Sequence, residues 1–399
     1  MSSERKFPPA CWAEAEGILL LRSIATGMVR LSQVANTGAT TLPYPDEAQR
    51  ALNSTILTCL LLKAEPPTSL LKLVEWAAHR PVDRWPAALP PDAVPPGSLL
   101  LDKATRQPTQ LCYEWAVDAE DSASLYSEQR YMTIAAQRCQ EEVHPEAYHA
   151  FRRLLVRRPV LTHRELTTLP AAGNGELEAL GDLLRDIYQP TPASYLDQEQ
   201  RTYTACARCH TLLHPTTEGG LWCERQRCRD MGTVRRGREY RADHGGGIHL
   251  LIRPLRQWVS EPGTWEIRMA RRLTNNGADV ELWPGFGNYG MRVRLPDGTA
   301  LAVDCKDWAS PALLGRQAKP PPPDPPYDRC TWVVPSARLR DRPGFRATFE
   351  RYRSSSSPDL ITDRELVGTV RQLVGPVALR NRHTGMALDR GDEPREGLF

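Results

Sequence analysis

Leu301-Ala-Val-Asp-Cys-Lys-Asp307 is the stretch that decides the fold of the C-terminal half of the chain. Its first three residues are apolar and predict a buried strand. Asp304 and Lys306 are two positions apart, a spacing that puts both side chains on one face of a strand. Because an acid and a lysine at the end of a buried strand are costly unless they are paired or used, the stretch indicates a functional site.

The segments on either side of this stretch alternate between helix and strand signals. Upstream, a helix is expected over 264–276, closed by Gly277, followed by strands over 279–283 and 289–295. Downstream, the pattern predicts a short helix over 312–318, a buried strand over 330–335 and a helix over 344–352. Pro320–Pro326 is expected to be a rigid polyproline loop. A flexible linker over 354–358 would precede a last helix over 363–374.

Glu266 is an acid on the apolar face of the expected helix, which it shares with Met269 and Leu273. Such an acid is unusual unless something binds it. A second interpretation is a glutamate at the helix edge that pairs with Arg256 or Arg271. Asp304 is suited to hold a divalent metal, and Lys306 to orient an attacking water and offset charge on a phosphate.

The order helix, hairpin, Asp-x-Lys strand, helix, strand resembles the PD-(D/E)xK restriction-endonuclease core over about residues 250 to 352. Three motifs, the Trp-Glu helix at 265–266, Ala278-Asp-Val-Glu-Leu-Trp-Pro-Gly285 and Val303-Asp-Cys-Lys-Asp-Trp308, are similar to one family in particular. It is the restriction-endonuclease-like protein of bacterial pPIWI-RE three-gene islands. The resemblance implies catalytic residues Glu266, Asp304 and Lys306, with Mg²⁺ or Mn²⁺ as cofactor. It also implies DNA as substrate, a pPIWI-RE protein and a DinG-type helicase as partners, and defence against invading DNA.

One position departs from the superfamily pattern. Active members usually carry an aspartate on the second strand, roughly a dozen residues before Asp-x-Lys, and Gly290 stands at that place. Three explanations stay open: Asp279 or Glu266 substitutes as the metal ligand, metal binding is weak, or the fold is retained for DNA binding alone. The sequence therefore supports two hypotheses, a metal-dependent DNA nuclease and a catalytically inactive subunit that binds DNA and assembles the defence complex.

A cysteine cluster precedes the nuclease-like region. Cys206 and Cys209 form one short pair, and Cys223 and Cys228 form a second pair after thirteen intervening residues. Two such pairs match a zinc ribbon, in which four thiolates close a structural tetrahedral Zn²⁺ site. His210 or His214 would be the replacement if one cysteine were not a ligand, although a surface position is expected for both.

Arginines surround the cluster and are candidates for contacts with DNA phosphates. The candidates are Arg225, Arg227, Arg229, Arg235, Arg236 and Arg238. The alternative is a solvated arginine-rich face, because the whole chain favours arginine over lysine.

Composition and patterning set the outline of the molecule. The chain has 399 residues, 41% of them hydrophobic, and a formal net charge of +3, which predicts a multidomain globular protein. No apolar run approaches the roughly 20 residues that span a bilayer, so we expect a cytoplasmic protein without membrane contact. We predict an α+β multidomain chain: a helical scaffold or docking region (1–200), a zinc-ribbon-like module (201–245), a restriction-endonuclease-like α/β core (246–375) and a polar tail (376–399).

Overall fold

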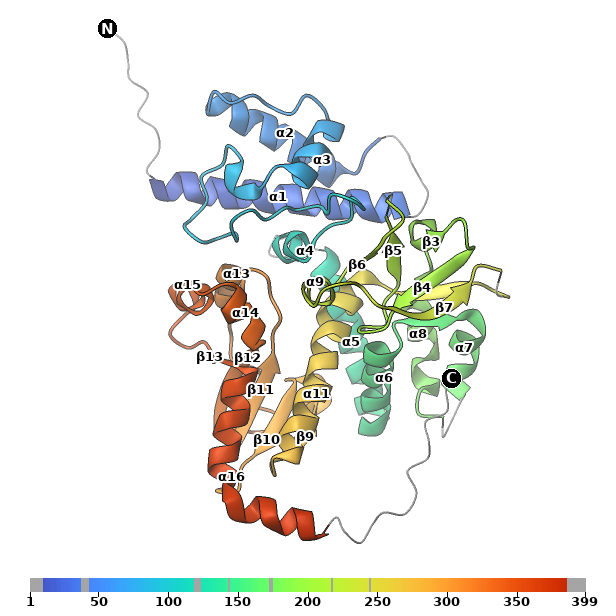
Figure 1. Cartoon of the computed structure of the whole chain (residues 1–399), viewed down its shortest axis with the longest axis vertical. Helices are drawn as coiled ribbons and strands as arrows, with labels where there is room; N and C mark the ends of the chain where they lie inside the picture. The colour runs from blue at the N-terminus through green and yellow to red at the C-terminus, as the bar shows by residue number, and fades with distance from the viewer. Residues whose placement is uncertain are drawn as a thin grey trace. The chain divides into compact units, whose positions relative to one another are not determined.

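A computed structural model describes residues 10–36, 43–117, 123–142, 144–171, 175–216, 218–243 and 245–385. The chain forms two compact units. The first contains the described residues up to Glu261, together with Trp308–Ala318 and Gly344–Ser355. The second contains Pro262–Asp307, Lys319–Pro343 and the described residues from Ser356 onward. The architecture mixes helices and sheets, with a helical N-terminal region (Figure 1).

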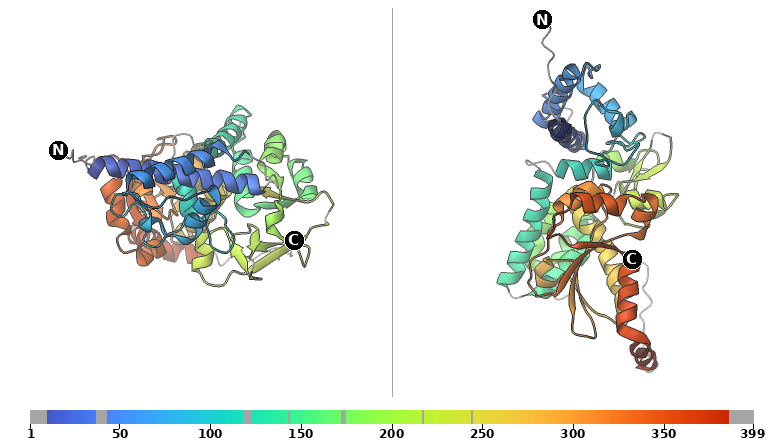
Figure 2. Two further views of the ribbon diagram at one scale, coloured as in Figure 1. Left: turned by 90° about the horizontal axis from the view of Figure 1, so that it is seen from above. Right: turned by 90° about the vertical axis from the view of Figure 1, so that its left-hand side faces the viewer.

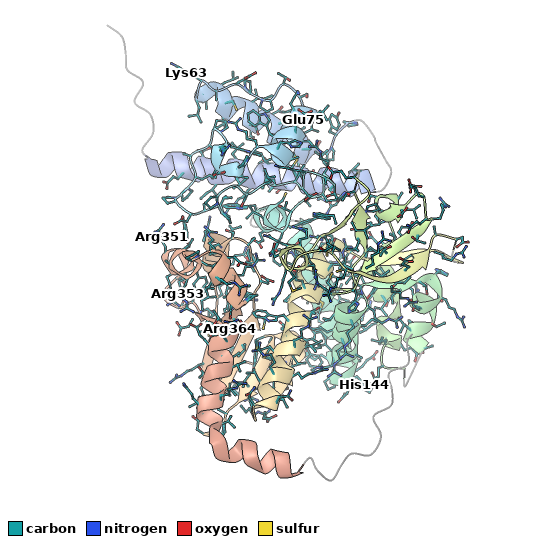
Figure 3. The ribbon with its side chains drawn as sticks, viewed as in Figure 1. Lys63, Glu75, His144, Arg351, Arg353 and Arg364 are labelled. Atoms are coloured by element: carbon teal, nitrogen blue, oxygen red, sulfur yellow. The ribbon has the colours of Figure 1, made fainter. Side chains whose placement is uncertain are left out.

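The first unit begins with helices whose apolar residues recur at helical spacing. They are α1 (Ala10–Asn36), α2 (Asp46–Leu61), α3 (Leu70–His79), η1 (Val82–Arg84), α4 (Gln110–Val117), α5 (Ala123–Glu141) and α6 (Pro145–Arg157). The stretches over 13–34, 47–63 and 69–78, in which apolar residues recur at three- and four-residue spacing, correspond to α1, α2 and α3. Ser69 caps α3 by accepting a hydrogen bond from the backbone N–H of Lys72. α2 ends at Leu61, and Lys63, which Figure 3 labels, follows with a left-handed φ of 54°.

Contrary to the expectation from the sequence, helix α1 contains a stretch, Glu16–Ala35, that is long and apolar enough to cross a membrane by length and composition alone. In the structure α1 packs against α2 and α4. The residues buried in this contact region include Leu21, Ile24, Ala25, Met28 and Val29. A buried apolar face is what a core helix of this length also requires, so the stretch is only weak support for a membrane span.

The remainder of the first unit is built from short elements. One three-stranded sheet has the order β1 (Val160–Thr162), β8 (Ile248–Leu251) and β2 (Tyr188–Pro190). The short helices of this part are α7 (His163–Thr168), η2 (Leu169–Ala171), η3 (Glu178–Leu180), α8 (Gly181–Ile187) and η4 (Ala193–Tyr195). α10 (Arg253–Leu255) and η5 (Arg256–Ser260), a short π-helix, follow β8. α13 (Pro311–Gln317) and α15 (Phe345–Tyr352) pack on each other and also belong to this unit.

The cysteine segment forms two small sheets in the first unit. One contains β3 (Leu196–Asp197), β4 (Thr202–Cys206) and β7 (Arg236–Arg241), and the other pairs β5 (Leu213–Pro215) with β6 (Leu221–Cys223). Helix α9 (Gln226–Asp230) follows β6. This segment has a small hydrophobic core of its own, centred on the cysteines and Leu213.

The second unit is a five-stranded mixed sheet in the order β13-β12-β11-β10-β9. Its strands are β9 (Asp279–Leu282), β10 (Met291–Arg294), β11 (Ala300–Cys305), β12 (Arg329–Val334) and β13 (Asp359–Thr362). β9, β10 and β11 are antiparallel, whereas β11, β12 and β13 run parallel. The helices are α11 (Glu261–Asn275), α12 (Pro284–Gly287), α14 (Ser336–Asp341) and α16 (Asp363–Gly385).

Helices α11 and α16 pack on the same face of this sheet. Trp265, Met269 and Leu273 from α11 share one core with Leu366, Val370 and Val374 from α16 and with sheet residues. The sheet residues in this core are Met291, Val293, Val303, Cys305 and Val333. α11 ends as the sequence predicts, because Gly277 takes a positive φ of 92° and its N–H bonds the carbonyl of Thr274.

Two boundaries differ from the sequence prediction. α16 continues to Gly385, so the predicted boundary at residue 375 falls within a helix, and residues 386–399 lie outside the described residues. The linker expected over 354–358 is exposed at residues 354–356, whereas Ser357 and Pro358 are buried and lead directly into β13. Figures 1 and 2 show α16 extending past the end of the sheet. The predicted domain boundaries as a set stay a prediction.

Candidate active site and cysteine centre

Asp304 and Lys306 lie together at the end of β11. The Nζ of Lys306 is 3.6 Å from an Asp304 carboxylate oxygen, and their side chains are 30% and 17% exposed. The backbone N–H of Lys306 donates to the carbonyl of Val333, which keeps the strand paired with β12 as far as this residue. The two-residue spacing thus brings the pair to one face, half-open to solvent.

Trp332 on the neighbouring strand β12 also fixes the Lys306 ammonium. In the parallel register, Asp304 pairs with Trp332, and Lys306 Nζ lies 4.9 Å from the centre of the Trp332 ring system. A cation above an aromatic face is attracted by the ring quadrupole. The ammonium is therefore held between a carboxylate and an indole.

Gly290 is the residue that stands where the second-strand acid was expected. Its backbone N–H donates to Asp304 Oδ1 at 2.7 Å. A Cβ added to Gly290 would lie 2.7 Å from Glu266 Oε1 and 3.0 Å from the Val303 carbonyl oxygen. The Glu266 carboxylate therefore occupies the space into which a side chain at position 290 would project.

Glu266 is supplied by helix α11 and is only 3% exposed. Its Oε2 accepts a hydrogen bond of 2.6 Å from the indole Nε1 of Trp283. Arg256, one of the partners considered from the sequence, instead binds Glu224 at 2.8 Å. Glu266 is thus a buried acid and not a helix-edge residue, with one oxygen held by Trp283 and the other facing Gly290.

The Cys305 thiol lies close enough to Glu266 and Asp304 for the charges of both acids to act on it. Burial raises the pKa of the Cys305 thiol well above its usual value, and the charges of Glu266 and Asp304 raise the pKa further. The thiol is therefore neutral, and it belongs to the hydrophobic core beneath the site. Carboxylates from α11 and β11 converge on Gly290 above it.

The structure does not bring Asp279 to this place. Asp279 begins β9 opposite Arg294, with which it forms an exposed ion pair of 3.2 Å. Arg294 in turn faces Ala300 at the start of β11, whereas Asp304 is near its end. Four residues of strand correspond to about 13 Å, so Asp279 sits at the opposite edge of the hairpin.

Residues that sequence reasoning missed support the site. Trp283 is fully buried and has a left-handed φ of 50°, which is unusual for a large side chain. Asp307 pairs with Arg338 of α14 at 2.6 Å, with both side chains largely buried. Trp332 resembles an ordinary strand residue in the sequence, and Trp283 belongs to the motif over 278–285 without any sign of its contact with Glu266. Asp307 is an additional acid directly after the Asp-x-Lys motif, and that position indicated a role beside the site.

The polyproline loop braces the hairpin that carries Gly290. Carbonyl oxygens of Asp324, Pro325 and Pro326 accept hydrogen bonds from the side chains of Asn288, Tyr289 and Arg292 at 2.6, 2.9 and 2.8 Å. A stiff proline-rich segment loses little entropy when it is ordered. The loop therefore acts as a fixed brace for the turn next to the site.

The four predicted cysteines come together in the first unit. The sulfur atoms of Cys206, Cys209, Cys223 and Cys228 all lie within 4.8 Å of one another, and all four residues are buried. The Arg208 N–H donates to Cys206 Sγ at 3.5 Å, as in a tight turn around a metal. Hydrogen bonds from the neighbouring thiols lower the pKa of Cys206. Four buried thiols in one cluster fit a closed tetrahedral metal site.

The two histidines do not join this cluster. Within the described part of the chain, the group that could hold a metal contains the four cysteines only. The expected surface position is wrong for His214, which is 3% exposed and stacks on Tyr195 with ring centres 3.8 Å apart. Burial lowers the pKa of His214 to about 4. His210 is exposed and has a left-handed φ of 62° in the turn after Cys209.

The predicted arginine fringe separates into structural and exposed residues. Arg225 is only 7% exposed and lies 3.9 Å from Glu261, which excludes it from a surface for phosphates. Arg229 donates to the Cys223 carbonyl and covers the Trp222 ring at 4.7 Å. Arg227 is half-buried. Exposed members remain on and beside β7, namely Arg235, Arg236 and Arg238, the last of which pairs with Glu165 at 3.2 Å.

A buried ionic cluster attaches the cysteine module to the helical part of the first unit. Glu224, next to Cys223, binds both Arg253 and Arg256 and lies 3.4 Å from the Tyr195 hydroxyl. Burial tends to raise the pKa of Glu224, but the two guanidinium groups outweigh burial and hold that pKa well below its usual range. Glu224 is therefore ionised in the interior, where its ion pairs with Arg253 and Arg256 offset the cost of removing the charge from water.

Two family comparisons match the chain. Residues 20–162 match the family described as pPIWI_RE three-gene island domain Y. Residues 263–376 match the family described as the REase associating with pPIWI_RE, where REase denotes a restriction endonuclease. The second match contains Glu266, Gly290, Asp304 and Lys306. Nothing matches among curated proteins or solved structures.

Proposed function

The chain belongs to the restriction-endonuclease-like proteins of pPIWI-RE three-gene islands, and from this we propose that it is a metal-dependent DNA nuclease. A restriction-endonuclease-like domain beside an island domain suggests a nuclease-like role in defence. The proposal adds the reaction, which is hydrolysis of a DNA phosphodiester bond, and the residues that perform it: Glu266, Asp304 and Lys306.

The oxygens around Gly290 fit a divalent cation. Glu266 Oε1 and the Val303 carbonyl face the position of the absent Cβ, and Asp304 Oδ1 accepts from the Gly290 N–H. Carboxylate and carbonyl oxygens are the ligands that Mg²⁺ and Mn²⁺ prefer. Glu266 and Asp304 would hold the cation, which when bound supplies positive charge that stabilises the transition state.

The remaining chemistry comes from the chain itself. The Lys306 ammonium, fixed by Asp304 and Trp332, is suited to donate a hydrogen bond to the attacking water and to offset charge on the phosphate. Water oxygen bonds to phosphorus as one ester P–O bond breaks, and the leaving oxygen receives a proton. The observation that carries the proposal is the Glu266 carboxylate in the space left by Gly290.

The test is cleavage of single-stranded and duplex DNA in Mg²⁺ and in Mn²⁺. Lys306→Ala and Glu266→Gln should each lower the rate by about 100-fold or more, the size seen when a transition-state stabilising group is removed. Asp279→Asn serves as the matched control for the loss of an acid, and it should cut like the wild type. A Lys306→Ala chain that cuts as fast as the wild type would falsify the proposal.

A second candidate function is a DNA-binding assembly subunit without catalysis. The glycine at position 290 favours it, because the usual second-strand acid is absent. It predicts DNA binding and a stable complex with island partners, but no scission with either metal. Cleavage that requires both a divalent metal and Lys306 would exclude this candidate.

We also propose a structural Zn²⁺ at the four cysteines, which would hold together a segment with a small core. Elemental analysis of purified protein should give about one zinc per chain. The proposed partners are the pPIWI-RE protein and the DinG-type helicase of the same island, with DNA as the shared substrate in the cytoplasm. Co-purification of the tagged chain from cells that express all three proteins tests the partnership.

A further inference from the structure

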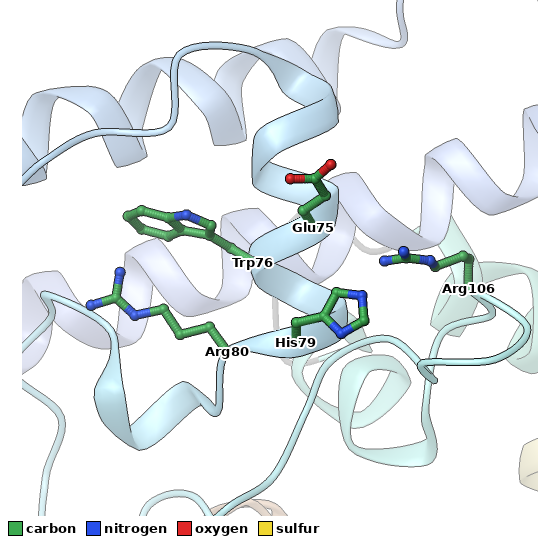
Figure 4. A pocket seen from close by; sticks show the side chains of 5 residues that line it. All are labelled: Glu75, Trp76, His79, Arg80 and Arg106. Atoms are coloured by element: carbon green, nitrogen blue, oxygen red, sulfur yellow. The ribbon is translucent and has the colours of Figure 1, made fainter.

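The helical N-terminal region contains a pocket far along the sequence from the nuclease motif. It has a volume of about 340 Å³ and is lined by Glu75, Trp76, His79, Arg80 and Arg106 (Figure 4). Helix α3 and the residue after it supply the first four, and the loop before α4 supplies Arg106. All of these residues belong to the first unit and to the segment that matches island domain Y.

Arg80 is held rigidly at the pocket wall. Its guanidinium carbon lies 4.5 Å from the centre of the Trp76 ring system, and its Nε donates to the Arg84 carbonyl at 3.0 Å. The Trp85 indole donates to the Arg80 carbonyl at 2.9 Å and packs edge-on against Trp76. These contacts use one face and the Nε of the guanidinium, and within the described part of the chain no residue bonds its two terminal nitrogens, so they are available to a ligand.

Arg106 reaches the same pocket from a strained turn. Its φ is 58°, a conformation that non-glycine residues seldom adopt. The carboxylate of Asp102 accepts from the N–H groups of Ala104 and Thr105 at 3.1 and 3.0 Å, and the Asp102 carbonyl accepts from the Arg106 N–H at 2.9 Å. Strain of this kind persists only where neighbouring contacts impose it and is common at ligand sites.

The charges of the pocket favour an anion. The Glu75 carboxylate forms an exposed ion pair with Lys72 at 2.8 Å, and the charge of Arg106 also acts on it. Among the residues that the structure describes, no carboxylate forms an ion pair with Arg80 or Arg106. Guanidinium groups bind phosphate oxygens with two parallel hydrogen bonds, and nucleic-acid bases stack on tryptophan rings and on guanidinium planes.

We propose that this pocket binds a short stretch of single-stranded DNA, with one phosphate at Arg80, another at Arg106 and a base against the Trp76–Arg80 stack. The proposal goes beyond the nuclease reaction and gives the helical region a task of its own, to hold the strand. It does not depend on catalysis, since binding is measured with a chain that carries Lys306→Ala.

The experiment is photocrosslinking of a single-stranded oligonucleotide that contains 5-iododeoxyuridine, followed by trypsin digestion and mass spectrometry. We expect the label on Trp76, in the tryptic peptide of residues 73–84, since trypsin does not cleave between Arg80 and Pro81. Fluorescence anisotropy of the same oligonucleotide should show about tenfold weaker binding for Arg80→Gln and for Arg106→Gln, which corresponds to about 1.4 kcal/mol each. Each variant should also reduce the salt dependence of binding by about one phosphate contact.

Arg84→Gln is the matched control, because Arg84 is an exposed arginine of η1 outside the pocket. It should change the affinity less than about twofold. Equal weakening by Arg84→Gln, or a label confined to other peptides, would overturn the proposal. Competition by free thymidine monophosphate as effective as by the oligonucleotide would also overturn it, since the site would then take free nucleotides. If the wild-type chain binds the oligonucleotide through this pocket but cuts no DNA, the result supports the pocket and contradicts only the proposed nuclease.

Discussion

At the scale of single residues, the site depends on Glu266, whose carboxylate occupies the space that a side chain at position 290 would fill. The sequence was sufficient to find Asp304 and Lys306, because a period of two places both on one face of a strand. It also revealed the missing acid at position 290. It could not choose between Asp279 and Glu266, because the choice depends on how α11 crosses the sheet. Only the fold brings Glu266 Oε1 to the Gly290 position.

Moving the acid back to the strand tests this arrangement. Gly290→Asp alone should inactivate and destabilise the protein, because its Cβ would lie within 2.7 Å of Glu266 Oε1 and a second negative charge would be buried. In a Glu266→Ala background, Gly290→Asp should instead recover part of the cleavage rate. A double-mutant cycle on cleavage and on the free energy of unfolding measures this coupling. Additive effects of the two substitutions would contradict it.

The Trp283 indole is expected to position Glu266. Trp283→Phe keeps most of the ring but removes the donor to Oε2, so Glu266 should bind the divalent cation less well. We expect the Mg²⁺ concentration for half-maximal cleavage to rise several-fold, with a loss of about 1–3 kcal/mol in stability. Trp85→Phe, which removes another indole hydrogen bond, should lower stability but leave the Mg²⁺ dependence unchanged. A similar metal shift in both variants would assign Trp283 a purely structural role.

At the scale of helices and strands, the length of each element determined whether the sequence could predict it. The long helices α1 and α2 follow the apolar spacing of their residues closely. The short α4 and β13 were missed, because eight and four residues carry little periodicity and both depend on tertiary contacts. β13 exists because it pairs in parallel with β12. α4 is fixed by its buried acid, Glu114.

Glu114 joins α4 to the start of α13. Its carboxylate is fully buried and accepts from the backbone N–H groups of Ala309 and Ser310 at 2.7 and 2.8 Å. Glu114→Gln replaces one acceptor oxygen with a donor facing an N–H, so the free energy of unfolding should fall by about 1–3 kcal/mol. Chemical denaturation measures this loss. Glu178→Gln, a loss of charge outside this contact, should change the stability by less than about 0.5 kcal/mol.

At the scale of the whole molecule, the cysteine centre stabilises more than its own segment. Glu224 follows Cys223 directly and binds Arg253 and Arg256, so a disturbed centre exposes a buried ionic cluster. Composition and spacing predicted the four cysteines. They could not predict the Glu224 cluster, because Arg253 and Arg256 lie about 30 residues further along the chain and two arginines do not stand out in an arginine-rich sequence. The same limit applies to Arg225, which the sequence suggested as a DNA contact.

Removal of the proposed zinc should therefore destabilise the first unit as a whole. Cys223→Ser is expected to lower zinc content and the unfolding temperature by several degrees or more, and to expose residues 201–243 to proteases. Cys330→Ser, a change of the same chemistry in β12, should affect none of these measurements. Elemental analysis, thermal denaturation and limited proteolysis provide the readouts. An unchanged unfolding temperature in metal-free protein would show that the cluster needs no ion.

The division of the chain into units has a genetic consequence. After Glu261 the backbone leaves the first unit, returns to it for Trp308–Ala318 and again for Gly344–Ser355, and ends in the second. Both returning segments lie inside the stretch that matches the endonuclease family. A gene broken between the two family matches would separate α13 and α15 from the unit in which they are packed. Recombination could thus not exchange the endonuclease half as an independent cassette, and the two halves are expected to be inherited as a single piece.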